Sequence, residues 1–316
     1  MNSLSAIFGA GVAIRNSLYD HGIFQVKKLA RPVISIGNIS VGGSGKTPFV
    51  IALGQLLAER GIACDVLSRG YGRSSTEIAL VDPKGSPAQF GDEPLLIARK
   101  LQAPVIVGAD RYQAGLLAEQ KFSSKLHLLD DGFQHRRLHR VFDIVLLPSD
   151  DQAGSLLPIG RLREPITALN RADAVVLTNS QTQAVEAKSI WHARRVIELP
   201  APAGKSVAFS GIARPGQFIA GLKASKIEIA GTITFRDHHG YQQRDIDRLL
   251  ELKKQTNADS FITTEKDLIN LGALSSQLSP LLTAKLRIEF ESPQQVVTEI
   301  IKTIEQRSGQ PILAPA

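Results

Sequence analysis

The chain has 316 residues, of which 43% are hydrophobic and 21% are charged, and its formal net charge is +7 at pH 7. This composition is that of an ordinary globular protein of about two domains, and it excludes fibrous and intrinsically disordered classes. The excess of cations favours an anionic partner such as phosphate or an acidic lipid surface.

The first predicted element is a helix within residues 1–30. Its apolar side chains, among them Leu4 and Ile7, are accompanied by cations such as Arg15 and Lys28. This make-up is typical of a helix that lies on an anionic membrane surface, and a helix packed on the domain is the alternative. No stretch reaches the roughly 20 apolar residues of a transmembrane helix, and no signal-peptide cleavage site is apparent.

From residue 31 onward, short apolar runs alternate with segments of helical character. The predicted strands occupy residues 33–36, 63–67, 104–107, 126–129, 144–147 and 174–177. Continuous apolar runs of this length indicate a mainly parallel sheet covered by helices on both faces. We therefore expect an α/β domain over residues 31–200. Its one cysteine, Cys64, can form no internal disulfide and fits a cytoplasmic setting.

A second, smaller α/β domain is predicted over residues 201–316. The proline-containing stretch 199–204 is a plausible linker to it. The elements expected beyond the linker are strands at 206–209, 227–235 and 260–263 and helices at 244–254 and 294–304.

The strongest motif follows the first predicted strand and opens the next helix. Its glycines allow the backbone to wrap a phosphate, and amides at the helix N-terminus point at the anion. We expect Lys46 to reach the β- and γ-phosphates of ATP and Thr47 to bind Mg²⁺. Ser40 replaces the usual first glycine, which is tolerated where φ is negative. The fold class is therefore α/β of the P-loop NTPase type, and the nucleotide-binding residues are Ser40, Val41, Gly42, Gly43, Ser44, Gly45, Lys46 and Thr47.

Two adjacent carboxylates, Asp130 and Asp131, follow the predicted strand 126–129. A P-loop protein needs a carboxylate at the end of a neighbouring strand to organise its metal. We expect these residues to do so here, with a helix cap or a turn as the alternative.

The basic segment 132–140 continues from this pair and includes Gln134. His135 and His139 have a spacing that zinc sites use, but no catalytic Glu and no third ligand stand nearby. We expect this segment to contact phosphate or substrate, and a solvated basic face is the alternative. No motif for nucleic-acid binding is present, so no nucleic-acid partner is expected.

Further candidates lie in predicted loops. Arg163 stands beside Glu164, and arginine suits bidentate contact with a transferring phosphate, although a surface ion pair is the alternative. Tyr71 and Arg73 lie at a flexible strand exit and could line a substrate cleft.

Chemistry alone gives modest roles to two further residues. Asp92 opens a predicted helix, where an N-cap is the ordinary role of aspartate. His238 lies in an Asp-His-His-Gly segment that would ordinarily form a turn.

Taken together, the motifs resemble those of the tetraacyldisaccharide 4'-kinase family. The resemblance spans nearly the whole chain, and the motifs are specific in combination. They are GNISVGGSGKTP at 37–48, LSRGYGR at 67–73, GDEP at 91–94, VGADR at 107–111, LLDDGFQHRRLHR at 128–140, LLPIGRLREP at 156–165 and TTEKD at 263–267.

The resemblance implies an active site in the cleft between two α/β domains, with ATP and Mg²⁺ as cofactors. The implied reaction moves the γ-phosphate of ATP to the 4'-hydroxyl of an acylated glucosamine disaccharide 1-phosphate and forms the lipid A precursor lipid IVA. It also implies that helix 1–30 holds the enzyme peripherally to the cytoplasmic face of the bacterial inner membrane.

Carried over by motif, Asp92 is the base near the acceptor hydroxyl and His238 is its partner. Arg163 with Glu164 lies at the transferring phosphate, and Lys46 holds phosphate. The implied metal-binding residues are Thr47, Asp130, Asp131 and Glu164, and the implied substrate-binding residues are Tyr71, Arg73, Gln134 and His135.

Three rival functions fit less well. A deviant P-loop ATPase switch carries a lysine after the first motif position, where this chain has Val41. A GTPase requires Asn-Lys-x-Asp, and the nearest string, residues 264–267, has its lysine in the wrong place. A membrane-binding module without activity would leave the P-loop without a purpose. The sequence makes no prediction of oligomeric state.

Overall fold

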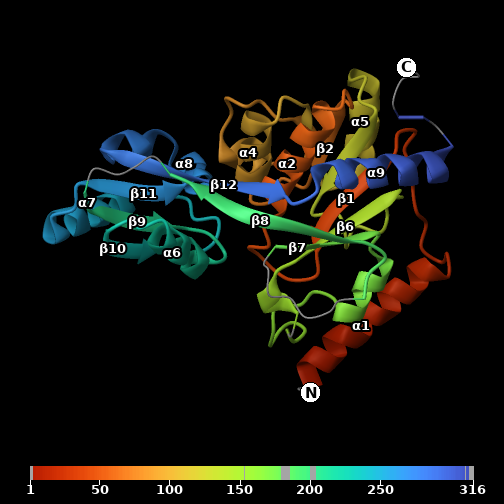
Figure 1. Ribbon diagram of the computed structural model, residues 1–316, viewed down its shortest axis with the longest axis horizontal. Coiled ribbons are helices and arrows are strands. Elements are labelled where there is room, and N and C mark those ends of the chain that lie inside the picture. The colour runs from red at the N-terminus through yellow and green to blue at the C-terminus, as the bar shows by residue number, and fades with distance from the viewer. Residues whose placement is uncertain (1–2, 153, 179–185, 200–203, 310, 313–316) are drawn as a thin grey trace.

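A computed structural model describes residues 3–152, 154–178, 186–199, 204–309 and 311–312. Two lobes lie side by side (Figure 1). The described residues between 3 and 178, with the closing helix at 293–308, form the larger lobe, and residues 204–280 form the smaller lobe. The long strands β8 (Ile190–Glu198) and β12 (Leu281–Phe290) run from one lobe to the other. The predicted linker at 199–204 falls mostly on residues 200–203, which lie outside the described part, so the division into domains there stays a prediction.

The described strands form one sheet in the order β10-β9-β11-β12-β8-β7-β6-β1-β5-β2-β4-β3. All neighbouring pairs are parallel except β3 with β4 and β8 with β12. The predicted mainly parallel α/β fold is therefore confirmed. The strands are β1 (Val33–Asn38), β2 (Cys64–Ser68), β3 (Ala79–Leu80), β4 (Val105–Val107), β5 (Leu126–Asp130), β6 (Phe142–Leu147), β7 (Ala174–Leu177), β8 (Ile190–Glu198), β9 (Ser206–Ser210), β10 (Ile229–Thr234), β11 (Ser260–Thr264) and β12 (Leu281–Phe290).

Helices cover both faces of the larger lobe's sheet. On one face, Ile34 and Ile36 of β1 belong to a buried cluster with Phe49 of α2. On the other face, Val33 of β1 clusters with Ala114 of α5. The helices are α1 (Ser3–Asp20), α2 (Lys46–Ala58), α3 (Pro87–Phe90), α4 (Asp92–Lys100), α5 (Arg111–Lys121), α6 (Pro215–Ala224), α7 (Gln243–Thr256), α8 (Glu265–Leu271) and α9 (Pro293–Ser308).

The closing helix, α9, packs on the larger lobe rather than on the smaller one (Figure 1). Its buried residues Val297, Ile300 and Ile304 belong to the same cluster as Phe49 of α2. The chain therefore returns to the larger lobe after it has built the smaller one. The predicted second domain, residues 201–316, includes α9, so the prediction did not anticipate that this helix would pack on the larger lobe.

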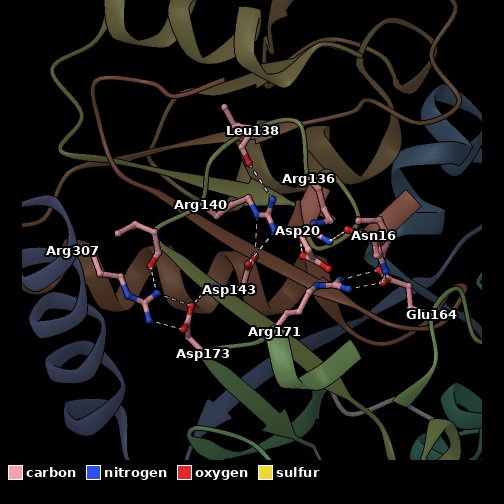
Figure 2. A network of polar contacts seen from close by, with 12 residues as sticks. Asn16, Asp20, Arg136, Leu138, Arg140, Asp143, Glu164, Arg171, Asp173 and Arg307 are labelled. Atoms are coloured by element: carbon pink, nitrogen blue, oxygen red, sulfur yellow. Dashed lines mark hydrogen bonds and ion pairs between the residues drawn. The ribbon is translucent and has the colours of Figure 1, made fainter. Parts of the chain in front are cut away.

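Helix α1 lies on the outside of the larger lobe (Figure 1), and of its described residues only Ser5 is buried. Polar contacts hold it in place (Figure 2). Asn16 Nδ2 donates to Glu164 Oε2 at 2.8 Å, and Arg136 donates to the Asn16 carbonyl at 3.1 Å and to Asp20 at 2.6 Å. No helix in the described part of the chain is long and apolar enough to span a membrane.

A close backbone approach fixes the end of β1 against the segment that follows β5. Gly132 N donates to the Ile36 carbonyl at 3.0 Å. A Cβ on Gly37 would lie 2.5 Å from Cβ and 2.8 Å from the backbone nitrogen of Phe133. Only glycine fits at this position, and the contact places Asp131 beside the loop that follows β1.

This contact gives a test of the fold. Gly37→Ala should lower the free energy of unfolding by about 1–3 kcal/mol, because the methyl group overlaps backbone that cannot easily move. Gly216→Ala is the matched control, since a Cβ at Gly216 in α6 meets nothing within 4 Å. It should leave stability unchanged or raise it by up to about 1 kcal/mol. Urea unfolding of both variants checks this, and equal stabilities would contradict it.

Candidate active site

A cavity of about 1310 Å³ lies between the lobes. The larger lobe contributes the glycine-rich loop 41–48 and the acidic residues Asp130 and Asp131 to its lining. The smaller lobe contributes residues 212–214 and 236–238. Most of the predicted site residues therefore face one space.

The glycine-rich loop has the geometry of a phosphate cradle. Gly42, Gly43 and Gly45 have φ values of 64°, 68° and 88°, which side chains other than hydrogen disfavour. Helix α2 begins at Lys46, and no side chain in the described ranges caps its N-terminus, which suits a helix end that receives an anion. Ser40 is not among the described non-glycine residues with positive φ. This agrees with the expectation that serine can replace the first glycine of the motif only where φ is negative.

Charged groups are ordered beside this loop. Lys46 Nζ donates to Asn38 Oδ1 at 3.1 Å and lies 3.3 Å from Asp131 Oδ1. Arg163 Nη1 lies 3.0 Å from Asp131 Oδ2. Burial opposes ionisation of Asp131, but the two cations outweigh it and lower the pKa of its carboxyl group. The aspartate thus holds both cations where the phosphates of a nucleotide would lie.

Asp130 has the properties of a cation ligand. Its Oδ2 accepts a hydrogen bond from Ser68 at 2.9 Å, whereas its buried Oδ1 has no hydrogen-bond partner among the residues that the structure describes. Burial and the negative charges of Glu93 and Asp131 raise the pKa of Asp130 to about 7. With Thr47 at the same cavity, these oxygen donors fit the preference of Mg²⁺. Among the described residues, no group of three or more His, Cys, Asp or Glu side chains could hold a metal, so a metal here would also need hydroxyl or phosphate ligands.

Asp92 and His238 meet across the two lobes. His238 Nδ1 lies 3.0 and 2.9 Å from the two carboxylate oxygens of Asp92. Among the described non-glycine residues, His238 is one of four with positive φ, at 56°, so the fold holds it in a disfavoured conformation. Asp92 is buried at the start of α4.

The surroundings keep Asp92 ionised. Burial raises its pKa, but the His238 hydrogen bond, Lys266 and Asn270 outweigh burial, so the pKa is lowered overall. For His238, burial favours the neutral ring, but the bond to Asp92 and nearby carboxylates prevail and raise the pKa. Asp92 is therefore ionised at neutral pH, which is the form that a general base requires.

Two residues of this cluster received no role from the sequence. Lys266 Nζ lies 3.2 Å from His238 Nε2 and 3.4 Å from Glu93 Oε1, and Asn270 Nδ2 donates to Asp92 Oδ2 at 3.0 Å. Both lie on α8, one helical turn apart. Lys266 lies within the TTEKD motif, which drew attention to it. Asn270 lies outside any motif, and the only sequence signal for it is its position four residues after Lys266, on the same face of the helix.

The predicted substrate-binding residues are divided between the cavity and its surroundings. Tyr71 lines the cavity, and its ring lies 5.0 Å from that of His238. Gln134 lies behind the loop, where it donates to the Asn38 carbonyl at 2.9 Å. Burial and neighbouring arginines lower the pKa of His135 to about 4. Arg73 and His135 do not line the cavity.

Glu164, predicted as a metal ligand, is also placed away from the cavity lining. It is fully buried and accepts hydrogen bonds from Arg171 at 2.9 and 3.2 Å and from Asn16 at 2.8 Å (Figure 2). It also accepts one from Gln134 at 3.1 Å. Gln134 in turn lies 3.4 Å from Arg163 Nη1. In this structure Glu164 therefore links α1 to the arginine of the cavity.

Comparison with known proteins gives the family. The family model described as tetraacyldisaccharide-1-P 4'-kinase matches residues 1–305. The tetraacyldisaccharide 4'-kinase of Koribacter versatilis is 49% identical over 322 residues, covering 98% of this chain and 100% of the relative. That of Aquifex aeolicus is 39% identical over 300 residues, covering 89% and 91%.

A solved structure agrees. LpxK from Aquifex aeolicus, in a crystal structure in complex with ATP, superposes with a TM-score of 0.77 at 34% identity and covers 95% of this chain and 97% of its own. The family predicted from the motifs is thereby confirmed. The chain belongs to the tetraacyldisaccharide-1-P 4'-kinase family.

Proposed function

We propose that this protein transfers the γ-phosphate of ATP to the 4'-hydroxyl of a tetraacyldisaccharide 1-phosphate and forms lipid IVA. The observation that carries the proposal is the pairing of buried Asp92 with His238, which lines one cavity together with a phosphate-binding loop. Family membership supplies the acceptor, and the ATP complex of the Aquifex aeolicus protein supports the donor. A nucleotide switch without an acceptor is not favoured, since it has no need of this pair.

Asp92 is the base of the proposed reaction. A sugar hydroxyl is a poor nucleophile at neutral pH, and an ionised carboxylate within reach can accept its proton. The 4'-oxygen then forms a bond to the γ-phosphorus while the bond from that phosphorus to the β–γ bridging oxygen breaks, and its electron pair leaves with ADP. His238 orients Asp92 through Nδ1, and Lys266 holds the other side of the ring.

The cations of the larger lobe bind the donor. Lys46 exchanges its contact with Asp131 for the β- and γ-phosphates, and Arg163 lies beside the transferring group. Thr47, Asp130 and Asp131 would hold Mg²⁺. Glu164 would act indirectly, because it binds Gln134, which in turn contacts Arg163. When bound, Mg²⁺ neutralises charge on the phosphates.

Helix α1 is the proposed membrane contact. Ile7, Ile14 and Ile23 in and just after it are 70%, 62% and 67% exposed, although such side chains are usually buried. The acceptor carries acyl chains, so an enzyme that meets it must reach the surface in which those chains lie. We place the protein peripherally on the cytoplasmic face of the inner membrane, where ATP is available.

The base assignment predicts a specific pattern of kinetics. Asp92→Asn should lower kcat about a hundredfold or more while ATP affinity changes little, because the amide cannot accept the hydroxyl proton. His238→Ala should lose less. The double variant should be less impaired than the product of the single effects, since the two residues act as a unit.

The measurement uses purified protein, labelled ATP, Mg²⁺ and a monophosphorylated tetraacyl disaccharide, with detection of a second phosphate on the lipid. His192→Ala on β8 is the control, because His192 is exposed and lies outside the cavity lining. If Asp92→Asn turned over at the parent rate, Asp92 would have only a structural role at the start of α4. The base would then have to be Asp130 or Asp131.

The membrane contact has its own test. Replacing Ile7 and Ile14 with Ser should lower the affinity for anionic vesicles, measured by sedimentation, about a hundredfold or more, since each Ile side chain transferred from water contributes about 1.5–3 kcal/mol. ATP binding should not change. Leu250→Ser on α7, where Leu250 is 39% exposed, is the control. If both variants sediment like the parent, α1 is not the membrane contact.

A further inference from the structure

The smaller lobe places an arginine directly on the phosphate-binding loop. A Cβ on Gly43 would lie 2.6 Å from Cγ, 2.9 Å from Cδ and 3.1 Å from Nε of Arg214, and one on Gly42 would lie 2.7 Å from Cβ of Ala213. The two glycines therefore leave room for a segment of the other lobe as well as for phosphate. Arg214 precedes α6, so the rest of the smaller lobe determines its position.

Most of the guanidinium is already bound by the larger lobe. Arg214 Nη2 donates to Asp151 Oδ1 and Oδ2 at 2.7 and 2.9 Å, and Nη1 donates to Asp150 Oδ2 at 3.3 Å. Asp151 also accepts a hydrogen bond from Ser40 Oγ at 2.5 Å. Ser40 and Asp151 are almost completely buried. The hydroxyl that replaces the first P-loop glycine thus fixes the carboxylate that holds Arg214.

One donor of Arg214 is left over. Its side chain is only 9% exposed, and the buried Nε has no hydrogen-bond partner in the described part of the chain. A buried, unpaired N–H of a cation is costly unless a ligand satisfies it. This N–H is also the polar atom of Arg214 that lies nearest to Gly43.

We propose that Arg214 is a phosphate-contacting arginine supplied in cis by the smaller lobe, and that its Nε–H donates to a γ-phosphate oxygen of bound ATP. Asp151 and Ser40 are positioning residues that aim it. In P-loop enzymes an added arginine stabilises the charge that develops during phosphoryl transfer. Here the same contact makes completion of the site depend on the two lobes being together, since the loop and the arginine come from different lobes.

A purely structural latch between the lobes is the competing explanation. A latch needs the ion pair with Asp151 but does not need the free Nε–H or its place beside Gly43. It predicts that loss of either partner lowers thermal stability equally and leaves kcat and the preference for ATP over ADP unchanged. The two explanations therefore differ in measurable ways.

The first experiment compares nucleotide binding and needs no lipid acceptor. In Arg214→Gln, and also in Arg214→Lys, affinity for ATP should fall on the order of tenfold, because a charge-assisted hydrogen bond is lost. Affinity for ADP should change less than about threefold, since ADP lacks the γ-phosphate. Arg194→Gln is the control, because Arg194 is 74% exposed, does not line the cavity and, within the described part of the chain, pairs only with Glu289. Equal losses for ATP and ADP, or none, would overturn the proposal.

The second experiment measures turnover in the full-length enzyme. Arg214→Gln should lower kcat about a hundredfold or more, the effect of removing one donor from developing charge. Asp151→Asn should lose less, and adding it to Arg214→Gln should cause no further loss in kcat. Ser40→Gly, which restores the usual P-loop residue, should lose kcat to a similar or smaller extent than Asp151→Asn.

Thermal unfolding of each variant separates these effects from misfolding. Parent-like kcat in folded Arg214→Gln would contradict the proposal and leave the latch. Absence of lipid phosphorylation by the parent protein would instead count against the proposed acceptor, while the nucleotide-binding result would still decide the role of Arg214.

Discussion

The parallel pairing of β1 with β5 is the constraint on which the active site depends. Ile36 of β1 lies in register with Asp130 of β5. Because parallel strands end at the same edge of a sheet, the loop after β1 and the acidic pair after β5 emerge next to each other. The contact of Gly37 with Phe133 brings the two segments closer than side chains would allow. Phosphate loop, lysine and metal-type carboxylates are therefore assembled within the larger lobe alone.

The second half of the site depends on a different kind of connection. The antiparallel pair β8 and β12 carries the chain into the smaller lobe and back, and α9 then packs on the larger lobe. Two strands alone would join the lobes less rigidly than a shared hydrophobic core does. Apolar packing also joins them, because Ile269 of α8 belongs to the same buried cluster as Leu95 of α4. The polar contacts across the cavity, from Asp92 to His238 and from Asp151 to Arg214, add to this packing.

Buried charge is the common feature of these contacts. Asp92 and Asp151 are almost fully buried, and each is surrounded by cations or donors from the opposite lobe. Removing one partner of such a pair leaves an uncompensated buried charge, which costs far more than the pair contributes. The arrangement favours a single relative placement of the lobes over a range of similar ones. Among the residues that the structure describes, Nε of Arg214 and Oδ1 of Asp130 have no hydrogen-bond partner, and a phosphate and a cation at the cavity would satisfy them.

The sequence by itself determined most strands of the larger lobe, strands β9, β10 and β11 of the smaller lobe, the phosphate loop and the family, but it missed the short strand β3. Apolar runs such as residues 144–147 and the spacing of glycines around Lys46 are local patterns, and local patterns can be recognised from the sequence alone. It did not indicate β8 or β12. Both strands are only partly buried and carry charged residues such as Arg194 and Arg287, so they lack the apolar run of a buried strand.

Only the tertiary structure decided which distant residues meet. Asp92 and His238 are 146 positions apart, and chemistry alone gave them the roles of a helix start and a turn. The family resemblance paired these two residues. No sequence signal indicated that Asp151 would contact both Ser40 and Arg214. None indicated that Glu164 would contact α1 through Asn16. These contacts follow from how the two lobes and the surface helix pack. The energies that select them come from burial and long-range pairing, which composition and spacing along the chain do not encode.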